Sequence, residues 1–142
     1  RPYKTDAGSG SLEQMALAEF CKENFNSHVK TIKNKLQKKS EAICNALDKY
    51  FGSSAEYKKP DGGIFVWVDM HKKVDTSRLY ELALKDGVAI NPGNEWSINK
   101  SGRHKMRLCF GNPSIKEIDE GIKRLAIICR KEFGIPTKIA NL

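Results

Sequence analysis

The stretch Pro60-Asp61-Gly62-Gly63-Ile64-Phe65-Val66-Trp67-Val68 decides the fold that the sequence predicts. Its first four residues are typical of a turn, because glycine adopts backbone angles that other residues avoid. Its last five are β-branched or aromatic, which favours a β-strand. Since these apolar residues follow one another without alternation, we expect other parts of the protein to cover both faces of the strand.

Before this strand, apolar residues at helical spacing predict two helices. The first begins at Ser11 and ends in the polar residues 24–27. The second extends from Val29 to Tyr50, and Gly52 is a suitable stop for it.

After the strand, the sequence predicts two more helices from their capping residues. Asp75 or Thr76 can cap the first of them. Ser114 and Glu117 have the spacing of a capping box for the second, which ends at Gly134. Shorter strands are expected at 55–59, 88–90 and 106–110. This order of elements predicts a small sheet with helices packed on it, an α/β sandwich.

Length and composition indicate one domain that buries a core, because 39% of the 142 residues are hydrophobic. The charged fraction of 30% argues against a disordered chain. No apolar run approaches the roughly 20 residues of a membrane span, so no membrane partner is expected. Because the chain begins with Arg1 and lacks the apolar core of a secretory signal, we expect a piece of a longer, cytoplasmic protein.

The net charge of +8 raises the possibility of nucleic-acid binding. The lysines between Lys30 and Lys49, however, alternate with apolar positions as on the solvated face of a helix, and no aromatic residues interleave with them. We therefore do not expect a nucleic-acid partner, and a free-standing basic nucleic-acid binder is a minor alternative.

Cysteines and histidines form no recognisable chemical site. The four cysteines stand far apart and are interpreted as buried free thiols of a reducing compartment. The three histidines are scattered, without the neighbours of a metal site or a hydrolytic triad, so no metal is expected. These residues are Cys21, Cys44, Cys109, Cys129, His28, His71 and His104.

Arg107 is the residue that departs from its surroundings, because it is a permanent cation in an apolar strand. In a strand of period two, its face is shared by Cys109 and Lys105. One interpretation is an exposed arginine at a sheet edge or surface, which is common. The other is a ligand-binding residue, because a guanidinium on a rigid strand matches a carboxylate with two parallel hydrogen bonds.

Four motifs follow one another along the chain: Pro60 to Val68, Gly87-Val88-Ala89-Ile90-Asn91-Pro92-Gly93, Met106-Arg107-Leu108-Cys109-Phe110 and Glu120-Gly121-Ile122-Lys123-Arg124-Leu125-Ala126. In this order they resemble class I and class II aminotransferases of fold type I, in the branch of 2-aminoadipate and aromatic aminotransferases and of the aminotransferase-like half of some regulators. The resemblance spans nearly the whole chain.

The resemblance implies that residues 1–142 are the C-terminal small domain of such an enzyme, with 1–28 a loop and helix leading in from a large domain. The implied fold is a small α/β sheet of about three to four mainly antiparallel strands packed against helices. In the family, the arginine at the position of Arg107 binds the α-carboxylate of the substrate. Gly62 and Gly63 would form a structural turn near this site. Trp96 stands where a phenylalanine is commoner.

The resemblance also implies pyridoxal 5'-phosphate as the cofactor, held mainly by the large domain through a Schiff-base lysine. No lysine of this sequence has the setting of that residue, so we expect no catalytic and no cofactor-binding residue in the chain, which alone would be inactive. The implied full-length protein is a homodimer of amino acid metabolism that moves an amino group between an amino acid and a 2-oxo acid. The alternative is the effector-sensing, aminotransferase-like domain of a transcriptional regulator.

Overall fold

The structure is a computed structural model that describes residues 10–99 and 101–139. Residues 1–9 of the expected lead-in segment therefore lie outside the described residues. The chain divides into two compact units, residues 1–35 and 36–142. The described part of the first unit is helical, and the second unit contains the sheet, two complete helices and the C-terminal part of a third.

Helix α1 (Ser11–Tyr50) is continuous, so the break predicted at residues 24–27 is wrong. The polar side chains of this stretch bond to carbonyl groups of the helix itself. The amide nitrogen of Asn24 donates to the carbonyl of Phe20 at 3.1 Å, and the hydroxyl of Ser27 donates to the carbonyl of Asn24 at 3.0 Å. Thr31 donates in the same way to the carbonyl of Ser27 at 3.0 Å. These bonds satisfy the polar groups without ending the helix.

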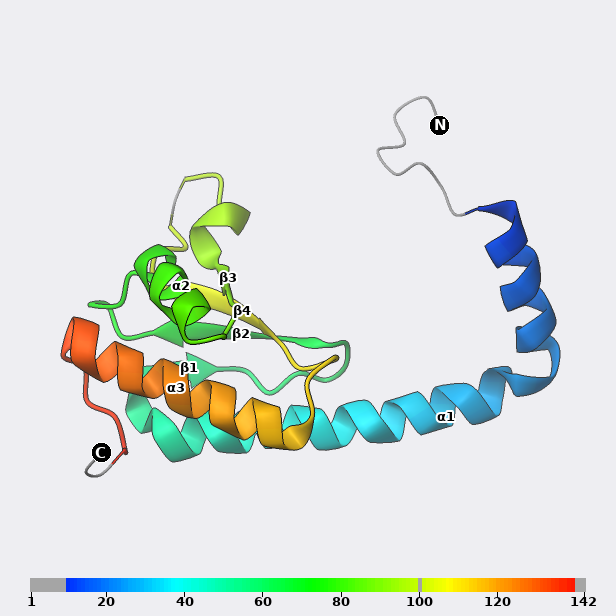
Figure 1. Cartoon of the computed structure of the whole chain (residues 1–142), viewed down its shortest axis with the longest axis horizontal. Coiled ribbons are helices and arrows are strands. Elements are labelled where there is room, and N and C mark those ends of the chain that lie inside the picture. Colours follow the sequence, from blue (N-terminus) through cyan, green and yellow to red (C-terminus); the bar gives the residue numbers. More distant parts are fainter. Residues whose placement is uncertain (1–9, 100, 140–142) are drawn as a thin grey trace. The chain divides into compact units, whose positions relative to one another are not determined.

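The sheet has four strands in the order β1-β2-β4-β3, and every neighbouring pair is antiparallel (Figure 1). The strands are β1 (Ala55–Tyr57), β2 (Phe65–Met70), β3 (Asn91–Pro92) and β4 (Lys105–Cys109). This confirms the predicted α/β class and the antiparallel sheet. The strand expected at 88–90 is displaced to Asn91–Pro92, because the N–H of Val88 still bonds to the carbonyl of Ala83 at the end of the preceding helix.

Strand β2 is covered on one face only, which corrects the expectation that both faces are buried. Val66, Val68 and Met70 point into the core, whereas Phe65 and Trp67 are 38% and 45% exposed. The helices supply core residues to the first face alone, and we call the other one the outward face of the sheet. It carries the odd-numbered residues of β2 and β4.

Helices α2 (Thr76–Lys85) and α3 (Ile115–Phe133) confirm their sequence signals. Asp75 accepts from the N–H groups of Ser77 and Arg78 and so caps α2. Ser114 and Glu117 form the predicted capping box, and Gly134 ends α3 in the left-handed conformation. Two short 3-10 helices, η1 (Gly52–Ser54) and η2 (Gly93–Trp96), complete the fold.

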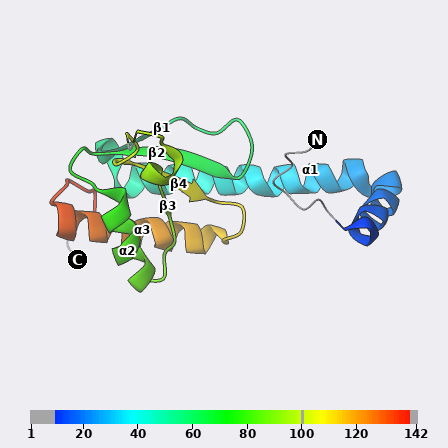
Figure 2. The ribbon, with the colours of Figure 1, turned by 90° about the horizontal axis from the view of Figure 1, so that it is seen from above.

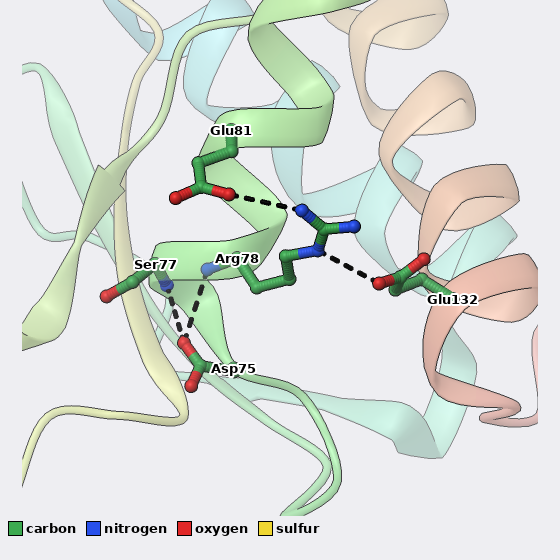
Figure 3. A network of polar contacts seen from close by, with 5 residues as sticks. All are labelled: Asp75, Ser77, Arg78, Glu81 and Glu132. Atoms are coloured by element: carbon green, nitrogen blue, oxygen red, sulfur yellow. Dashed lines mark hydrogen bonds and ion pairs between the residues drawn. The ribbon is translucent and has the colours of Figure 1, made fainter.

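Figures 1 and 2 show α3 running beside the last turns of α1. Polar contacts join α3 to α2 as well, as Figure 3 shows. Arg78 of α2 bonds to Glu132 of α3 at 3.0 Å and to Glu81 of its own helix at 3.2 Å. The helices cover the inner face of the sheet, whereas the side chains of the outward face are in contact with solvent. The apolar core between them includes Leu47, Leu79, Met106 and Leu125, all at most 1% exposed.

Candidate functional site

Arg107 lies at the centre of the outward face. In the strand register it is directly opposite Trp67 of β2 on one side and Asn91 of β3 on the other. Its neighbours along β4, Met106 and Leu108, are buried in the core. Backbone pairing on both sides and buried neighbours hold the strand rigidly, so the base of the Arg107 side chain is fixed in place.

Two aromatic rings contact the guanidinium group of Arg107. Its Cζ atom lies 4.1 Å from the centroid of the Phe65 ring and 4.0 Å from that of the Trp96 ring. Both distances are within the range of cation–π interactions. Trp67 contacts Trp96 edge to face, with ring centroids 6.4 Å apart and planes at 85°. Arg107 is therefore stacked rather than extended into solvent, and the interpretation as an ordinary surface arginine is not favoured.

The guanidinium carries hydrogen-bond donors that nothing in the described part of the chain satisfies. Its Nε atom is buried without a hydrogen-bond partner. The neighbouring cation Lys105, by contrast, is paired with Asp69 of β2 at 3.2 Å. A planar cation without a bonded carboxylate is a suitable site for an anionic ligand, and two parallel N–H groups favour a carboxylate.

A hollow of about 340 Å³ lies on the same face and is lined in part by Trp67, Asp69 and Lys105. Trp67 is opposite Arg107, and Lys105 precedes it by two residues on the same face of β4. Arg107 is not among the residues that line this hollow. A second hollow of about 690 Å³, between α3 and Gly87, does not include Arg107 among its lining residues.

Trp96 belongs to η2 and contacts the guanidinium of Arg107 from there. The first residue of η2, Gly93, packs closely against Gly102. A Cβ atom placed on Gly93 would come within 2.5 Å of the carbonyl oxygen of Gly102. Only glycine permits this close approach of two backbone segments. The contact anchors the start of η2 and thereby the direction from which Trp96 meets Arg107.

Gly62 and Gly63 lie in the bend before β2, as the sequence predicts. Gly63 has a φ of 78°, a value that side chains disfavour, and a Cβ atom on either glycine would meet nothing within 4 Å. Phe65, which follows two residues after Gly63, is one wall of the Arg107 stack. The bend therefore supports the site through backbone geometry.

The aromatic stack was not predicted from the sequence. Phe65 and Trp67 are two residues apart in a strand, which places them on one face, and this was the signal available. Their position beside Arg107 depends on the pairing of β2 with β4, and that of Trp96 depends on a turn outside both strands. A single sequence does not show these tertiary contacts.

The expectation that all four cysteines are buried is wrong. All four cysteines are free, but Cys109 is exposed on the outward face and Cys21 is only partly buried, so not all are buried. Among residues 10–99 and 101–139, no group of three or more histidine, cysteine, aspartate or glutamate residues could hold a metal ion. No helix in the described ranges is both long and apolar enough to cross a membrane.

Fold and site together define a two-layer α/β domain whose sheet carries Arg107 on its outward face, in contact with two aromatic rings and with an Nε that has no partner among the described residues. The family model described as aminotransferase class I and II matches residues 1–125. The chain therefore belongs to the class I and II aminotransferases, which are pyridoxal phosphate enzymes. The family predicted from the four motifs is confirmed.

Individual proteins agree with this assignment. The chain is 31% identical to 2-aminoadipate transaminase of Thermus thermophilus over 84% of its length, which is 30% of that protein. It is 32% identical to an uncharacterized HTH-type transcriptional regulator of Bacillus subtilis over 90% of its length, or 26% of that protein. The chain thus spans less than a third of these relatives.

A solved structure shows the same fold. The alpha-aminoadipate aminotransferase of Thermus thermophilus, complexed with N-(5'-phosphopyridoxyl)-L-leucine, superimposes with a TM-score of 0.81 at 29% identity. The alignment covers 89% of this chain and 32% of that protein. The α/β fold expected from the resemblance is therefore confirmed.

The outward face does not fit the cofactor of this family. Its lysine, Lys105, is held by Asp69 at 3.2 Å rather than left free for a carbonyl group. Arg107 is the group there that retains unsatisfied donors among the described residues. The residues of the outward face therefore do not provide the free lysine that this cofactor needs.

Proposed function

We propose that residues 1–142 are the C-terminal small domain of an aminotransferase, with 1–28 leading in from a large domain. The full-length protein would move an amino group between an amino acid and a 2-oxo acid with pyridoxal phosphate bound by that large domain. Support comes from the family match over residues 1–125 and from the chain's coverage of about 30% of an aminotransferase relative.

Arg107 would bind the substrate's carboxylate. The observation that supports this is the guanidinium on the outward face of the sheet, which two aromatic rings contact and which bonds to no carboxylate among the described residues. The carboxylate is common to the amino acid and the oxo acid, so one arginine serves both half-reactions. By fixing the carboxylate, the arginine orients the bond to be broken, and a misplaced substrate loses rate steeply.

The test is Arg107→Ala in the full-length protein. Binding of both the amino acid and the oxo acid should weaken by roughly 2 to 4 kcal/mol, the scale for removing one partner of a charged hydrogen-bonded pair. Arg103→Ala is the matched control, because Arg103 lies four residues away and pairs with Asp75 at 3.0 Å instead. Unchanged kinetics of Arg107→Ala with both substrates would contradict the assignment.

We further propose that the full-length protein is a cytoplasmic homodimer of amino acid metabolism without nucleic-acid or membrane partners. The family resemblance supports the dimer, and the solvated spacing of the lysines supports the absence of a nucleic-acid role. Sedimentation of the full-length protein tests the dimer. Titration of the full-length protein with DNA at low salt tests the expected absence of nucleic-acid binding, because nonspecific binding by a basic surface is strongest at low salt.

The alternative is an effector-sensing domain of a transcriptional regulator, which the similarity to the Bacillus subtilis regulator favours. In that protein Arg107 would hold the carboxylate or another anionic group of an effector without turnover. A winged-helix segment roughly 300 or more residues upstream, a separation set by ordinary domain sizes, would favour the regulator. Amino-group transfer by the full-length protein would favour the enzyme.

A further inference from the structure

We propose that Phe65 and Trp96 are positioning residues for Arg107: their rings contact its guanidinium and hold it so that a substrate carboxylate meets its two Nη nitrogens. This inference rests on the proposed carboxylate-binding function of Arg107 and adds the direction of approach and the residues that impose it.

The two aromatic rings and the burial of Nε limit how a carboxylate can approach Arg107. The ring centroids of Phe65 and Trp96 lie 4.1 Å and 4.0 Å from the Cζ atom of Arg107, so both rings occupy space next to the guanidinium that a ligand would otherwise use. Within the plane, a carboxylate can use either Nε with one Nη or the two Nη nitrogens. Because Nε is buried from solvent, the first mode is closed. The pair of Nη nitrogens remains, and it accepts a carboxylate end-on in the guanidinium plane.

The stack is not a simple extension of the hydrophobic core. Trp96 is 54% exposed and Phe65 is 38% exposed, whereas core residues beside them such as Val66 and Met106 are at most 1% exposed. Half-exposed rings on a solvated face add little to folding by burial. They do immobilise a long side chain, and fixing a group before its ligand arrives lowers the ordering cost of binding.

Further contacts keep Trp96 in place. Its ring meets the ring of Trp67 edge to face at 6.4 Å, and its 3-10 helix starts at the close contact of Gly93 with Gly102. Phe65 is fixed in a different way, because it belongs to β2 and pairs with Cys109 in the ladder. The two walls thus come from separate elements, and each can be altered without the other.

The experiment compares Trp96→Leu, Phe65→Leu and Trp96→Phe in the full-length protein. Leucine keeps an apolar side chain but removes the aromatic face, and KM for both the amino acid and the oxo acid should rise about tenfold, with kcat changed far less. Trp96→Phe restores an aromatic face and should return KM to near its original value. Ile98→Ala is the control, because Ile98 lies two residues from Trp96 and is fully exposed.

A double variant separates positioning from general damage. If Trp96 acts through the guanidinium, Trp96→Leu should add no further increase in KM once Arg107 is replaced by alanine. Equal KM values for Trp96→Leu and the unchanged protein would overturn the inference, as would a parallel loss of kcat and thermal stability that Trp96→Phe does not restore.

Failure of the positioning role and failure of the carboxylate site give different results. If Arg107→Ala raises KM and Trp96→Leu does not, the proposed function stands and the positioning role is wrong. If Arg107→Ala leaves both substrates unaffected, the carboxylate site itself is wrong, whatever the Trp96 variants show.

Discussion

The hydroxyl of Tyr50, the last residue of α1, donates a hydrogen bond of 2.9 Å to Oδ2 of Asp119 on α3. Lys49 bonds to the same carboxylate at 3.0 Å. The hydrogen bond from Lys49 and, to a smaller extent, the one from Tyr50 lower the pKa of Asp119 below its usual value. This group of three side chains joins two helices whose apolar faces share one core.

The lowered pKa of Asp119 predicts a loss of stability in acid. A carboxyl group whose pKa is lower in the folded state stabilises the fold above its unfolded pKa of about 4, and the contribution disappears as the pH falls through the folded pKa. Thermal unfolding of Asp119→Asn should therefore vary less below about pH 4 than that of the unchanged protein. Asp61→Asn is the control, since Asp61 is 92% exposed. Parallel acid curves for Asp119→Asn and the unchanged protein would refute the prediction.

The thiols should differ sharply in reactivity. Cys109 is exposed and should react readily with a thiol reagent, whereas burial raises the pKa of Cys129 to about 12 and keeps it protonated. Cys129 should be labelled only after unfolding. The raised pKa also predicts that its contribution to stability falls as the pH rises from about 9 towards 12. Mass spectrometry of peptides after brief labelling distinguishes the sites, and rapid modification of Cys129 in the folded protein would contradict the structure.

The glycines should not be equivalent on replacement by alanine. Gly93→Ala places a Cβ atom 2.5 Å from the carbonyl oxygen of Gly102 and should destabilise by about 1–3 kcal/mol. Gly63→Ala should cost about 1 kcal/mol because of its φ of 78°. Gly62→Ala meets no atom within 4 Å and is the matched control. Denaturant unfolding measures all three, and equal effects at Gly62 and Gly93 would argue against the close contact.

The capping box of α3 should contribute measurably to stability. Ser114→Ala removes the hydroxyl that accepts from the N–H of Glu117 and should cost about 1 kcal/mol. Ser114 also lowers the pKa of Glu117, so this carboxyl should titrate closer to its ordinary value in the variant. Ser77→Ala is the control, because only the backbone N–H of Ser77 takes part in the cap of α2. An unchanged unfolding midpoint for Ser114→Ala would count against the cap.

Alternate residues of β4 should respond differently to truncation. Met106 is fully buried, and Met106→Ala should cost about 2–5 kcal/mol by leaving a cavity. Lys105→Ala should change stability by less than about 1 kcal/mol, because its ion pair with Asp69 is half exposed. Comparable losses for both variants, measured by denaturant unfolding, would mean that the outward face is covered.

Local signals in the sequence predicted the helix ends well. Asp75, Ser114 and Gly134 act within one turn of themselves, so their roles follow from residue type and spacing. The continuity of α1 through Asn24 and Ser27 was missed because side chains that favour helix ends can also bond back to the helix. The one-sided burial of β2 was missed because apolar residues on an open face resemble those of a covered strand.

The candidate site was predictable in part. Arg107 stood out as a cation between apolar residues, and the family resemblance supplied the role that spacing alone left open. Phe65 and Trp96 were not assigned to it, because their contacts with the guanidinium bring together a strand, a 3-10 helix and a second strand from different parts of the chain. Such a cluster depends on the strand register, which a single sequence does not encode locally.

The alternation of β4 separates two roles of side chains within five residues. Met106 and Leu108 are needed for folding, since they fill the core. The other three residues of β4 lie on the outward face and contribute little to the core. Selection for a new ligand can therefore change one row of side chains while the other keeps the protein folded. A domain built in this way can diverge in specificity with little loss of stability, and related proteins with different roles can retain the same scaffold.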